Sequence, residues 1–307
     1  MNYTLNQLRI FLKVVQLRSI TKAAEALHLT QPAVSIQVKN FQDQFEIPLI
    51  EVLNKKIYVT DFGQEVAASA EQILQEVEGI QSKLHAFKGE LSGKLKISVV
   101  STGKYIAPYF IADFIQTHRN VTLLMDVTNK AQVVESLEKN QVDFALVSVL
   151  PDKLNIEKEE LMQNKLFLVG NNATNTPKSK HAKKVFQDLP IIYREKGSAT
   201  RFVMEKYFKE LQIPAKMTME LTSNEAVKQA LIAGLGFSIM PLIGLRNELE
   251  QNQVQIIPVQ GLPLISTWHL IWLKDKKLDL VARAFLRHIQ SNKQEIIADK
   301  FAWHEKY

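Results

Sequence analysis

The run SITKAAEALHLTQPAVSIQVKNFQDQF, residues 19–45, has the pattern of two short helices joined by a tight turn. Apolar residues recur in its first half at helical spacing, and Ala23 and Ala24 are small enough for a second helix to cross closely. After the turn, Thr30 is a good N-cap for the second helix, and Pro32 suits a first turn. The stretch therefore predicts a helix-turn-helix.

The second helix has two different faces. Val34, Val38 and Phe41 form an apolar stripe that we expect to be buried. The residues beside the stripe are mostly short and polar, as the major groove of DNA requires: glutamine can bond an adenine edge, and serine can reach a base or a phosphate. An ordinary helical hairpin with a polar outer face fits the periodicity equally well. If the segment binds DNA, the expected contacts are Ser19, Thr21, Thr30, Gln31, Pro32, Ser35, Ile36 and Lys39.

The longer run LNQLRIFLKVVQLRSITKAAEALHLTQPAVSIQVKNFQ, residues 5–42, resembles the N-terminal domain of LysR-type transcriptional regulators. The similarity continues through Thr60, Asp61, Phe62 and Gly63 and, more loosely, over the whole chain. It implies an α/β protein with an N-terminal winged helix-turn-helix, with the motif at about residues 19–40, and a long linker helix. A C-terminal effector domain of two Rossmann-like lobes, like a periplasmic binding protein, would follow.

Residues 1–60 are the expected DNA-binding domain. A turn at Asn54 joins two short β segments into a wing, which places Lys55 and Lys56 near its tip, where they would meet phosphates. An exposed hairpin with solvated lysines is the alternative. The chain departs from the family at Glu46, where glycine is usual, and around Ile50 and Val52, where an aromatic residue and an arginine are usual.

Residues 61–89 predict one long helix with a narrow apolar seam. The seam residues alternate at spacings of four and three, which is the pattern of a two-helix contact. We expect this helix to form a homodimer, and the resemblance implies a dimer of dimers on a pseudo-palindromic promoter site. Packing onto the chain's own body is the alternative. The expected dimerisation residues are Val66, Ala70, Ile73, Val77, Ile80 and Leu84.

From residue 90 to residue 307 the pattern alternates between strands and helices, which predicts parallel sheets covered by helices. The resemblance implies one lobe over residues 93–162 and 267–307 and a second over residues 163–266. The tail after Ala298 is expected to be loosely held, with packing of Phe301 and Trp303 as the alternative.

Ligands of open parallel sheets bind beyond the carboxyl ends of the strands. Hydroxyl groups, glycines and cations follow several predicted strands, and backbone N–H groups at helix starts can hold an anion. Plain helix capping is the alternative for each loop. The expected effector contacts are Ser101, Thr102, Gly103, Lys104, Thr128, Asn129, Ser148, Ser198, Thr200, Arg201 and Thr222.

The string SVVSTGKYIAPYFIADF, residues 98–114, further resembles the RuBisCO operon regulators within the family. That resemblance implies a phosphorylated metabolite or a related anion as the effector. For a regulator of this family, RNA polymerase is a further expected partner.

Composition narrows the remaining classes. The net charge is +6, which favours an anionic partner, and the chain has no cysteine, which excludes disulfides and thiol catalysis. The start of the chain shows no signal peptide, so we expect a cytoplasmic protein without a membrane span. Histidines lack ligand spacing, and enzyme motifs are absent or incomplete, so no metal, cofactor or catalytic residue is expected. An enzyme or a solute-binding protein without a DNA-binding role is the rival interpretation.

Overall fold

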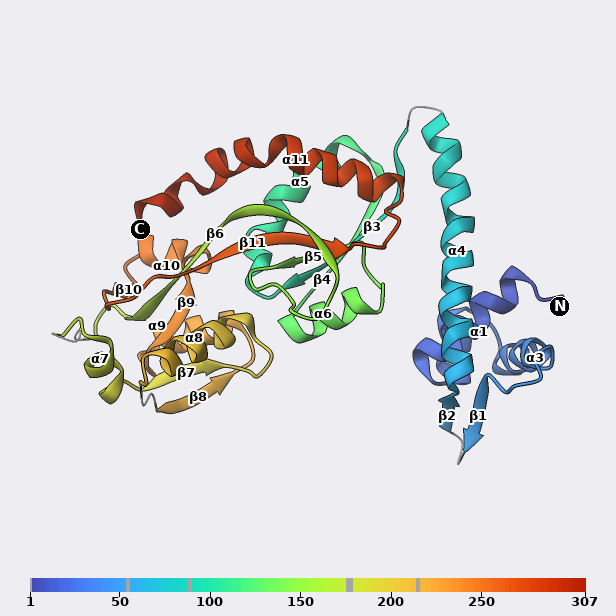
Figure 1. Ribbon diagram of the computed structural model, residues 1–307, viewed down its shortest axis with the longest axis horizontal. Coiled ribbons are helices and arrows are strands. Elements are labelled where there is room, and N and C mark those ends of the chain that lie inside the picture. The colour runs from blue at the N-terminus through green and yellow to red at the C-terminus, as the bar shows by residue number, and fades with distance from the viewer. Residues whose placement is uncertain (1, 54–55, 88–89, 175–178, 214–215) are drawn as a thin grey trace. The chain divides into compact units, whose positions relative to one another are not determined.

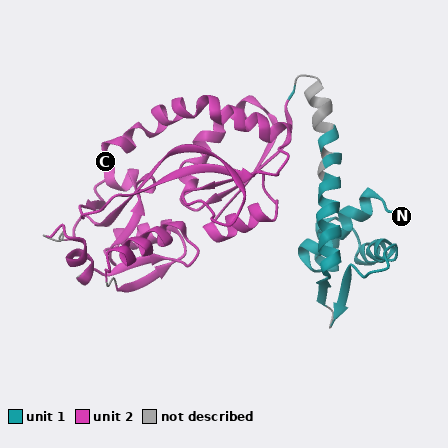
Figure 2. Cartoon of the chain, viewed as in Figure 1, with its two compact units in different colours: residues 1–90 teal, residues 91–307 magenta. Residues whose placement is uncertain are grey.

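A computed structural model describes residues 2–53, 56–87, 90–174, 179–213 and 216–307. The chain divides into two compact units, Met1–Glu90 and Leu91–Tyr307 (Figure 2). Among the described residues, no helix is both long and apolar enough to cross a membrane.

Unit 1 is a winged helix-turn-helix followed by one long helix (Figure 1). Its helices begin at side-chain caps: Thr4 and Gln7 form a capping box, and Ser19 and Thr30 cap the next two helices. The two strands pair antiparallel and make the wing. The elements are α1 (Leu5–Leu17), α2 (Ile20–Ala26), α3 (Gln31–Gln42), β1 (Ile50–Leu53), β2 (Lys56–Val59) and α4 (Asp61–Phe87).

The core of unit 1 forms where α1, α2 and α3 cross. Ala23 is fully buried, which lets α2 approach the other helices closely, as predicted. The predicted stripe of α3 is also buried, and Phe41 packs against Phe11 with ring centroids 5.1 Å apart. Burying this stripe fixes which face of α3 remains exposed.

Helix α4 begins at Asp61, and the Oγ1 of the preceding Thr60 accepts the N–H of Gly63 at 2.9 Å. Its first turns pack on unit 1 itself: Ala70 is 1% exposed, and Val66 packs against the same core. Ala70 is therefore covered by the helical domain and offers no surface to a partner helix, whereas Val66 is half-buried and its expected dimerisation role stays a prediction.

Unit 2 contains two lobes. The first lobe is built from β3 (Ser92–Val100), η1 (Gly103–Tyr105), α5 (Ala107–Thr117), β4 (Asn120–Thr128), α6 (Lys130–Glu138), β5 (Phe144–Val147) and α11 (Leu280–Phe301). The second lobe is built from α7 (Ala182–Asp188), β7 (Ile191–Arg194), α8 (Ala199–Glu210), β8 (Met217–Leu221), α9 (Asn224–Ile232), β9 (Ser238–Pro241), η2 (Leu242–Gly244), α10 (Arg246–Glu250) and β10 (Val254–Ile257). The long strands β6 (Ile156–Asn171) and β11 (Leu264–Leu273) run through both, and η3 (Ala302–Lys306) ends the chain.

The main sheet has the strand order β10-β6-β11-β5-β3-β4, with β9 also paired to β6. Strands β3, β4 and β5 are parallel, as expected, and so are β7 and β8 in their own small sheet. The expectation of purely parallel sheets is wrong for β6 and β11, which pair antiparallel because the chain passes between the lobes once in each direction (Figure 1).

The two lobes have separate cores joined at the crossing strands. Trp268, Phe144 and Phe285 are buried in the first, and Phe186 and Ile239 in the second. On β6, Met162 belongs to the first core and Leu166 to the second, so the hinge between the lobes lies between these two positions.

Residues 299–307 are packed and not loosely held, and Phe301 and Trp303 both pack against the cores. Helix α11 continues to Phe301, which is 3% exposed and stacks beside Phe110 with ring centroids 6.0 Å apart. Helix η3 then follows directly. The aromatic residues of this segment bury enough apolar surface to order it.

Candidate functional site

The outer face of α3 is free for DNA in unit 1. Gln31, Pro32 and Lys39 are exposed, Ile36 is 57% exposed, and Ser35 is half-buried. Two N-cap residues flank this face. The Oγ of Ser19 accepts the N–H of Lys22 at 3.3 Å, and the Oγ1 of Thr30 accepts the N–H of Ala33 at 3.4 Å. Thr21 is exposed on α2. Most of these residues lie at the beginning of α2 and α3, whereas Lys39 lies in the last turn of α3.

The wing carries an exposed lysine, Lys56, at the start of β2. Lys55 lies outside the described residues, so its predicted phosphate contact stays a prediction. Val52, Leu53 and Tyr58 are more than half exposed on the same hairpin. The wing therefore offers both charge and apolar surface.

Residues 101–105 of the first lobe contact the second lobe of unit 2 through side-chain hydrogen bonds. The Oγ of Ser101, at the end of β3, accepts hydrogen bonds from Arg194 Nη2 at 3.1 Å and from Asn224 Nδ2 at 3.3 Å. Arg194 ends β7, and Asn224 begins α9, so a predicted effector residue of the first lobe meets strand and helix termini of the second. These groups therefore meet where the two lobes contact each other, beyond the carboxyl ends of β3 and β7, and this contact region is called the cleft below.

Arg194 is the buried cation of this cleft. Its side chain is 3% exposed, and its Nε and Nη2 donate to Glu195 at 2.8 and 2.9 Å. Its Nη1 and the Oδ1 of Asn224 are buried without a hydrogen-bond partner among the described residues. A buried polar group without a partner is costly, so both atoms are candidates for contact with a bound molecule.

Lys104 and Tyr105 also reach the second lobe, but they meet an acid there. The hydroxyl of Tyr105 donates to Glu225 Oε2 at 2.9 Å, and Lys104 Nζ lies 3.7 Å from the same oxygen. Burial raises the pKa of Tyr105, and the Glu225 contact raises it further. Burial of Glu225 opposes its ionisation, yet hydrogen bonds from Lys228 and Tyr105 hold its pKa below the usual range.

The charge on Lys104 is therefore partly balanced within the protein. The hydroxyl of the neighbouring Tyr105 is also engaged, because it donates a hydrogen bond to Glu225 of the second lobe. Residues 101–104, which the sequence predicted to hold an anion, thus also form a contact between the two lobes.

Arg201 is not the free cation that the sequence suggested. Its Nε donates to Glu205 at 2.7 Å, and its Nη1 donates to Glu220 at 2.6 Å and to the carbonyl of Arg194 at 2.9 Å. Two carboxylates neutralise it, because α8 carries one on the next turn and β8 carries the other. Arg201 is therefore not an unpaired cation, and its expected contact with an anionic effector stays a prediction.

Gly103 serves packing. A Cβ at Gly103 would lie 2.7 Å from Val99 Cγ1 and 3.1 Å from Leu146 Cδ2, so the glycine lets η1 lie directly on the core. Thr102 and Ser148 are buried close to strand ends of the first lobe.

Several of the other predicted effector residues lie at helix N-termini, where two of them accept hydrogen bonds from backbone N–H groups. Asn129 caps α6 and Ser198 caps α8, while Thr128 bonds Gln132. Asn129 also reaches the second lobe, since a Cβ on Gly197 would lie 3.6 Å from its Oδ1. Thr200 is buried, and Thr222 is exposed outside this cluster of contacts.

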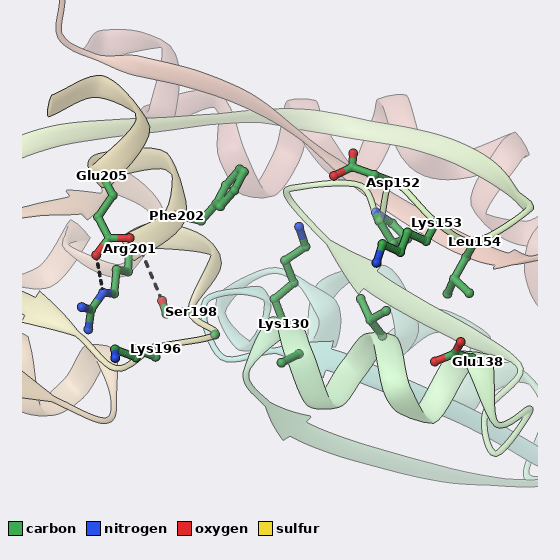
Figure 3. A pocket seen from close by; sticks show the side chains of 14 residues that line it. Lys130, Glu138, Asp152, Lys153, Leu154, Lys196, Ser198, Arg201, Phe202 and Glu205 are labelled. Carbon is green, nitrogen blue, oxygen red and sulfur yellow. Dashed lines mark hydrogen bonds and ion pairs between the residues drawn. The ribbon is translucent and has the colours of Figure 1, made fainter. Parts of the chain in front are cut away.

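A cavity of about 620 Å³ opens between the lobes on the α6 side. Lys130 and Phe202 face it from opposite lobes, with the Lys130 ammonium 5.0 Å from the ring centroid, whereas Arg201 turns toward Glu205 (Figure 3). Burial lowers the pKa of Lys130. Of the predicted effector residues, Ser198 and Arg201 line this cavity.

Sequence reasoning missed Arg194, Asn224 and Glu225. Arg194 was within reach of the strand-end rule, because it directly follows the apolar residues of a short predicted strand. Asn224 and Glu225 begin a helix, where their residue types are explained by capping and by the helix dipole. Their contacts with residues 101–105 depend on how two distant segments meet.

Comparison with known proteins identifies both units. Residues 5–64 match the family described as bacterial regulatory helix-turn-helix protein, lysR family. Residues 88–294 match the LysR substrate binding domain. The RuBisCO operon transcriptional regulator of Allochromatium vinosum is 36% identical over 299 residues, which are 95% of this chain and 97% of that protein.

Two solved structures are similar to the chain. The regulatory domain of CcmR from Synechocystis PCC6803, in complex with 2-PG, is 27% identical with a TM-score of 0.63, and the match covers 66% of this chain and 98% of that domain. Full-length CbnR complexed with its target DNA shares the fold, with a TM-score of 0.65 at 19% identity over 94% of this chain and 99% of that one.

Proposed function

Because the chain belongs to the LysR family of bacterial transcriptional regulators, we propose that an anionic small molecule binds between its two lobes, beside Ser101 and Arg194. The family assigns DNA binding to unit 1 and effector binding to unit 2. Its relatives are transcriptional regulators rather than enzymes. The proposed contact residues rest on the contacts between the lobes, and the proposed chemical class rests on those contacts and on a similar domain.

The unsatisfied Nη1 of Arg194 is the observation that carries the proposal. A buried guanidinium nitrogen needs an acceptor, and charged oxygens of a phosphate or carboxylate make the strongest hydrogen bonds to it. Ser101 can turn its hydroxyl toward the same ligand. Such a ligand would hold Arg194 of one lobe and Ser101 of the other, so binding would favour one arrangement of the lobes.

A phosphorylated carboxylate is the chemical class that we propose. The CcmR domain, similar over unit 2, was solved with 2-PG, which is 2-phosphoglycolate. The phosphate would meet Arg194 and Ser101, and the carboxylate would compete with Glu225 for Lys104. An anion with two charged groups would engage Arg194 and Lys104 together, in competition with the carboxylates of Glu195 and Glu225.

The proposed assembly is a homotetramer, a dimer of dimers, in the cytoplasm on promoter DNA. Two reading heads per dimer suit a pseudo-palindromic site, with α3 in successive major grooves. RNA polymerase is the further partner that the family resemblance implies. Effector binding would change the DNA bend through the spacing of the heads.

Thermal shift measurements on the full chain test the ligand. We expect the melting temperature to rise steadily with the 2-phosphoglycolate concentration, and to rise much less with glycolate or inorganic phosphate. Ser101→Ala and Arg194→Gln should lose most of this shift. Lys130→Ala, in the cavity on the α6 side, should keep it.

The outcomes separate two locations. A shift lost in Lys130→Ala and kept in Arg194→Gln would move the site to the cavity lined by Phe202. No shift with any phosphorylated carboxylate would contradict the proposed ligand class. Circular dichroism of each variant shows that a lost shift is not a lost fold.

A further inference from the structure

Lys165 is a buried lysine at the hinge between the lobes. It lies on β6 between Met162 of the first core and Leu166 of the second, and it pairs with Ile265 on β11, the other crossing strand. It is 8% exposed. A buried ammonium needs hydrogen-bond acceptors. The residues that supply them show which segment of the chain is bound to the hinge.

All three acceptors come from the last residues of the chain. The Nζ of Lys165 donates to the carbonyl of His304, to Glu305 Oε2 and to the carbonyl of Tyr307, each at 3.2 Å. These bonds use the three protons of the ammonium. The chain end is therefore fastened to the hinge itself, 139 residues away in sequence at the nearest contact.

The same segment also contacts both lobes. Phe301 is part of the first core, next to Phe110. Trp303 packs against the first core and against the second-lobe cluster around Leu245, and the guanidinium of Arg246 lies 5.5 Å from its ring centroid. A change in the angle between the lobes would have to break or rearrange these contacts.

We propose that residues 301–307 form a latch that restrains rotation of the two lobes about the β6–β11 hinge. Phe301 anchors the latch in the first lobe, Trp303 and Arg246 fasten it to the second, and Lys165 holds it on the hinge. Such a latch biases the resting arrangement that an effector must shift. The restraint acts whichever effector binds, because none of these contacts involves the cleft residues Ser101 and Arg194.

Hydrogen exchange on the full chain, without ligand, tests the latch. Lys165→Met keeps an unbranched side chain of similar size but removes three hydrogen bonds from the hinge. If the latch restrains the lobes, exchange should rise at residues 101–106 and 195–198, on the cleft side where Ser101 meets Arg194. Arg246→Ala, which changes an exposed side chain, should give a smaller rise at the same sites.

Lys276 provides the matched control. Its Nζ also has three acceptors, the Asn140 Oδ1 at 2.9 Å, the Val142 carbonyl at 2.8 Å and Asp143 Oδ1 at 3.2 Å, all within the first lobe. Lys276→Met should raise exchange near residues 139–143 but not at the cleft.

Unchanged exchange at residues 101–106 and 195–198 in both latch variants would overturn the proposal. So would an equal rise in Lys276→Met. If Lys165→Met fails to fold, Arg246→Ala decides the question by the same criterion.

Discussion

Gln31 is the first residue of α3 and is exposed beside the capping Thr30. Its amide can bond a base edge bidentately, so we expect Gln31→Ala to weaken binding at a cognate site by about 1–3 kcal/mol and to relax one base position. Gel shifts with the cognate promoter and with random DNA measure both effects. An equal loss on random DNA would show that Gln31 contacts only the backbone.

His304 gives unit 2 a pH dependence. Burial first, and then Lys165, hold its pKa below its ordinary value of 6.5, and Glu305 only partly opposes this. The folded protein therefore keeps His304 neutral where the unfolded chain takes up a proton. Its contribution to stability is complete above about pH 6.5 and is lost as pH falls from there toward the folded pKa. Melting curves between about pH 7.5 and 5.5 should show a smaller loss in His304→Gln than in the unchanged protein, and equal slopes would refute the assignment.

The first turn of helix α4 packs closely against the backbone of Leu49, and this contact requires a glycine at position 63. A Cβ on Gly63 would lie 2.0 Å from the carbonyl oxygen of Leu49, which is backbone and cannot move aside freely. Gly63→Ala should destabilise unit 1 by about 1–3 kcal/mol in urea unfolding. A Cβ on Gly79, in the same helix, would meet nothing within 4 Å, so Gly79→Ala should stabilise by up to about 1 kcal/mol. Equal effects would mean that helix propensity, not the Leu49 contact, decides.

The exposed part of α4 carries the dimerisation prediction. Ile73 and Ile80 are 40% and 62% exposed, and Val77 is half-buried, whereas the side chain of Leu84 lies outside the described part of the chain. Ile80→Lys should weaken the dimer without unfolding unit 1, because Ile80 is outside its core. Sedimentation velocity measures the change. Gln72→Lys, an exposed position off the seam, is the control, and equal dissociation in both would place the contact elsewhere.

At the scale of the whole molecule, each unit has its own core. We therefore expect residues 91–307, produced alone, to fold and to keep the melting temperature and the 2-phosphoglycolate shift of unit 2 in the full chain. Calorimetry of the full chain should resolve two transitions. A fragment that is unfolded by circular dichroism would show that unit 2 needs unit 1.

Local chemistry in the sequence determined the helical domain and much of the strand-helix order. The caps at Ser19 and Thr30 and the stripe of Val34, Val38 and Phe41 follow from bonds and burial within a few turns of chain, so periodicity and residue type suffice to predict them. The strand-end rule likewise reached Ser101, because the position of a loop after a strand is a local property.

Only the tertiary structure decided which charges are free and what holds the lobes. Arg201 and Lys104 look alike as loop cations, yet the first is neutralised by Glu205 and Glu220 and the second is paired with Glu225. The sequence also did not predict that β6 and β11 cross between the lobes antiparallel, or that Trp303 packs against both lobes. Each depends on segments far apart in the chain, and no local preference of a residue specifies the partner it will meet.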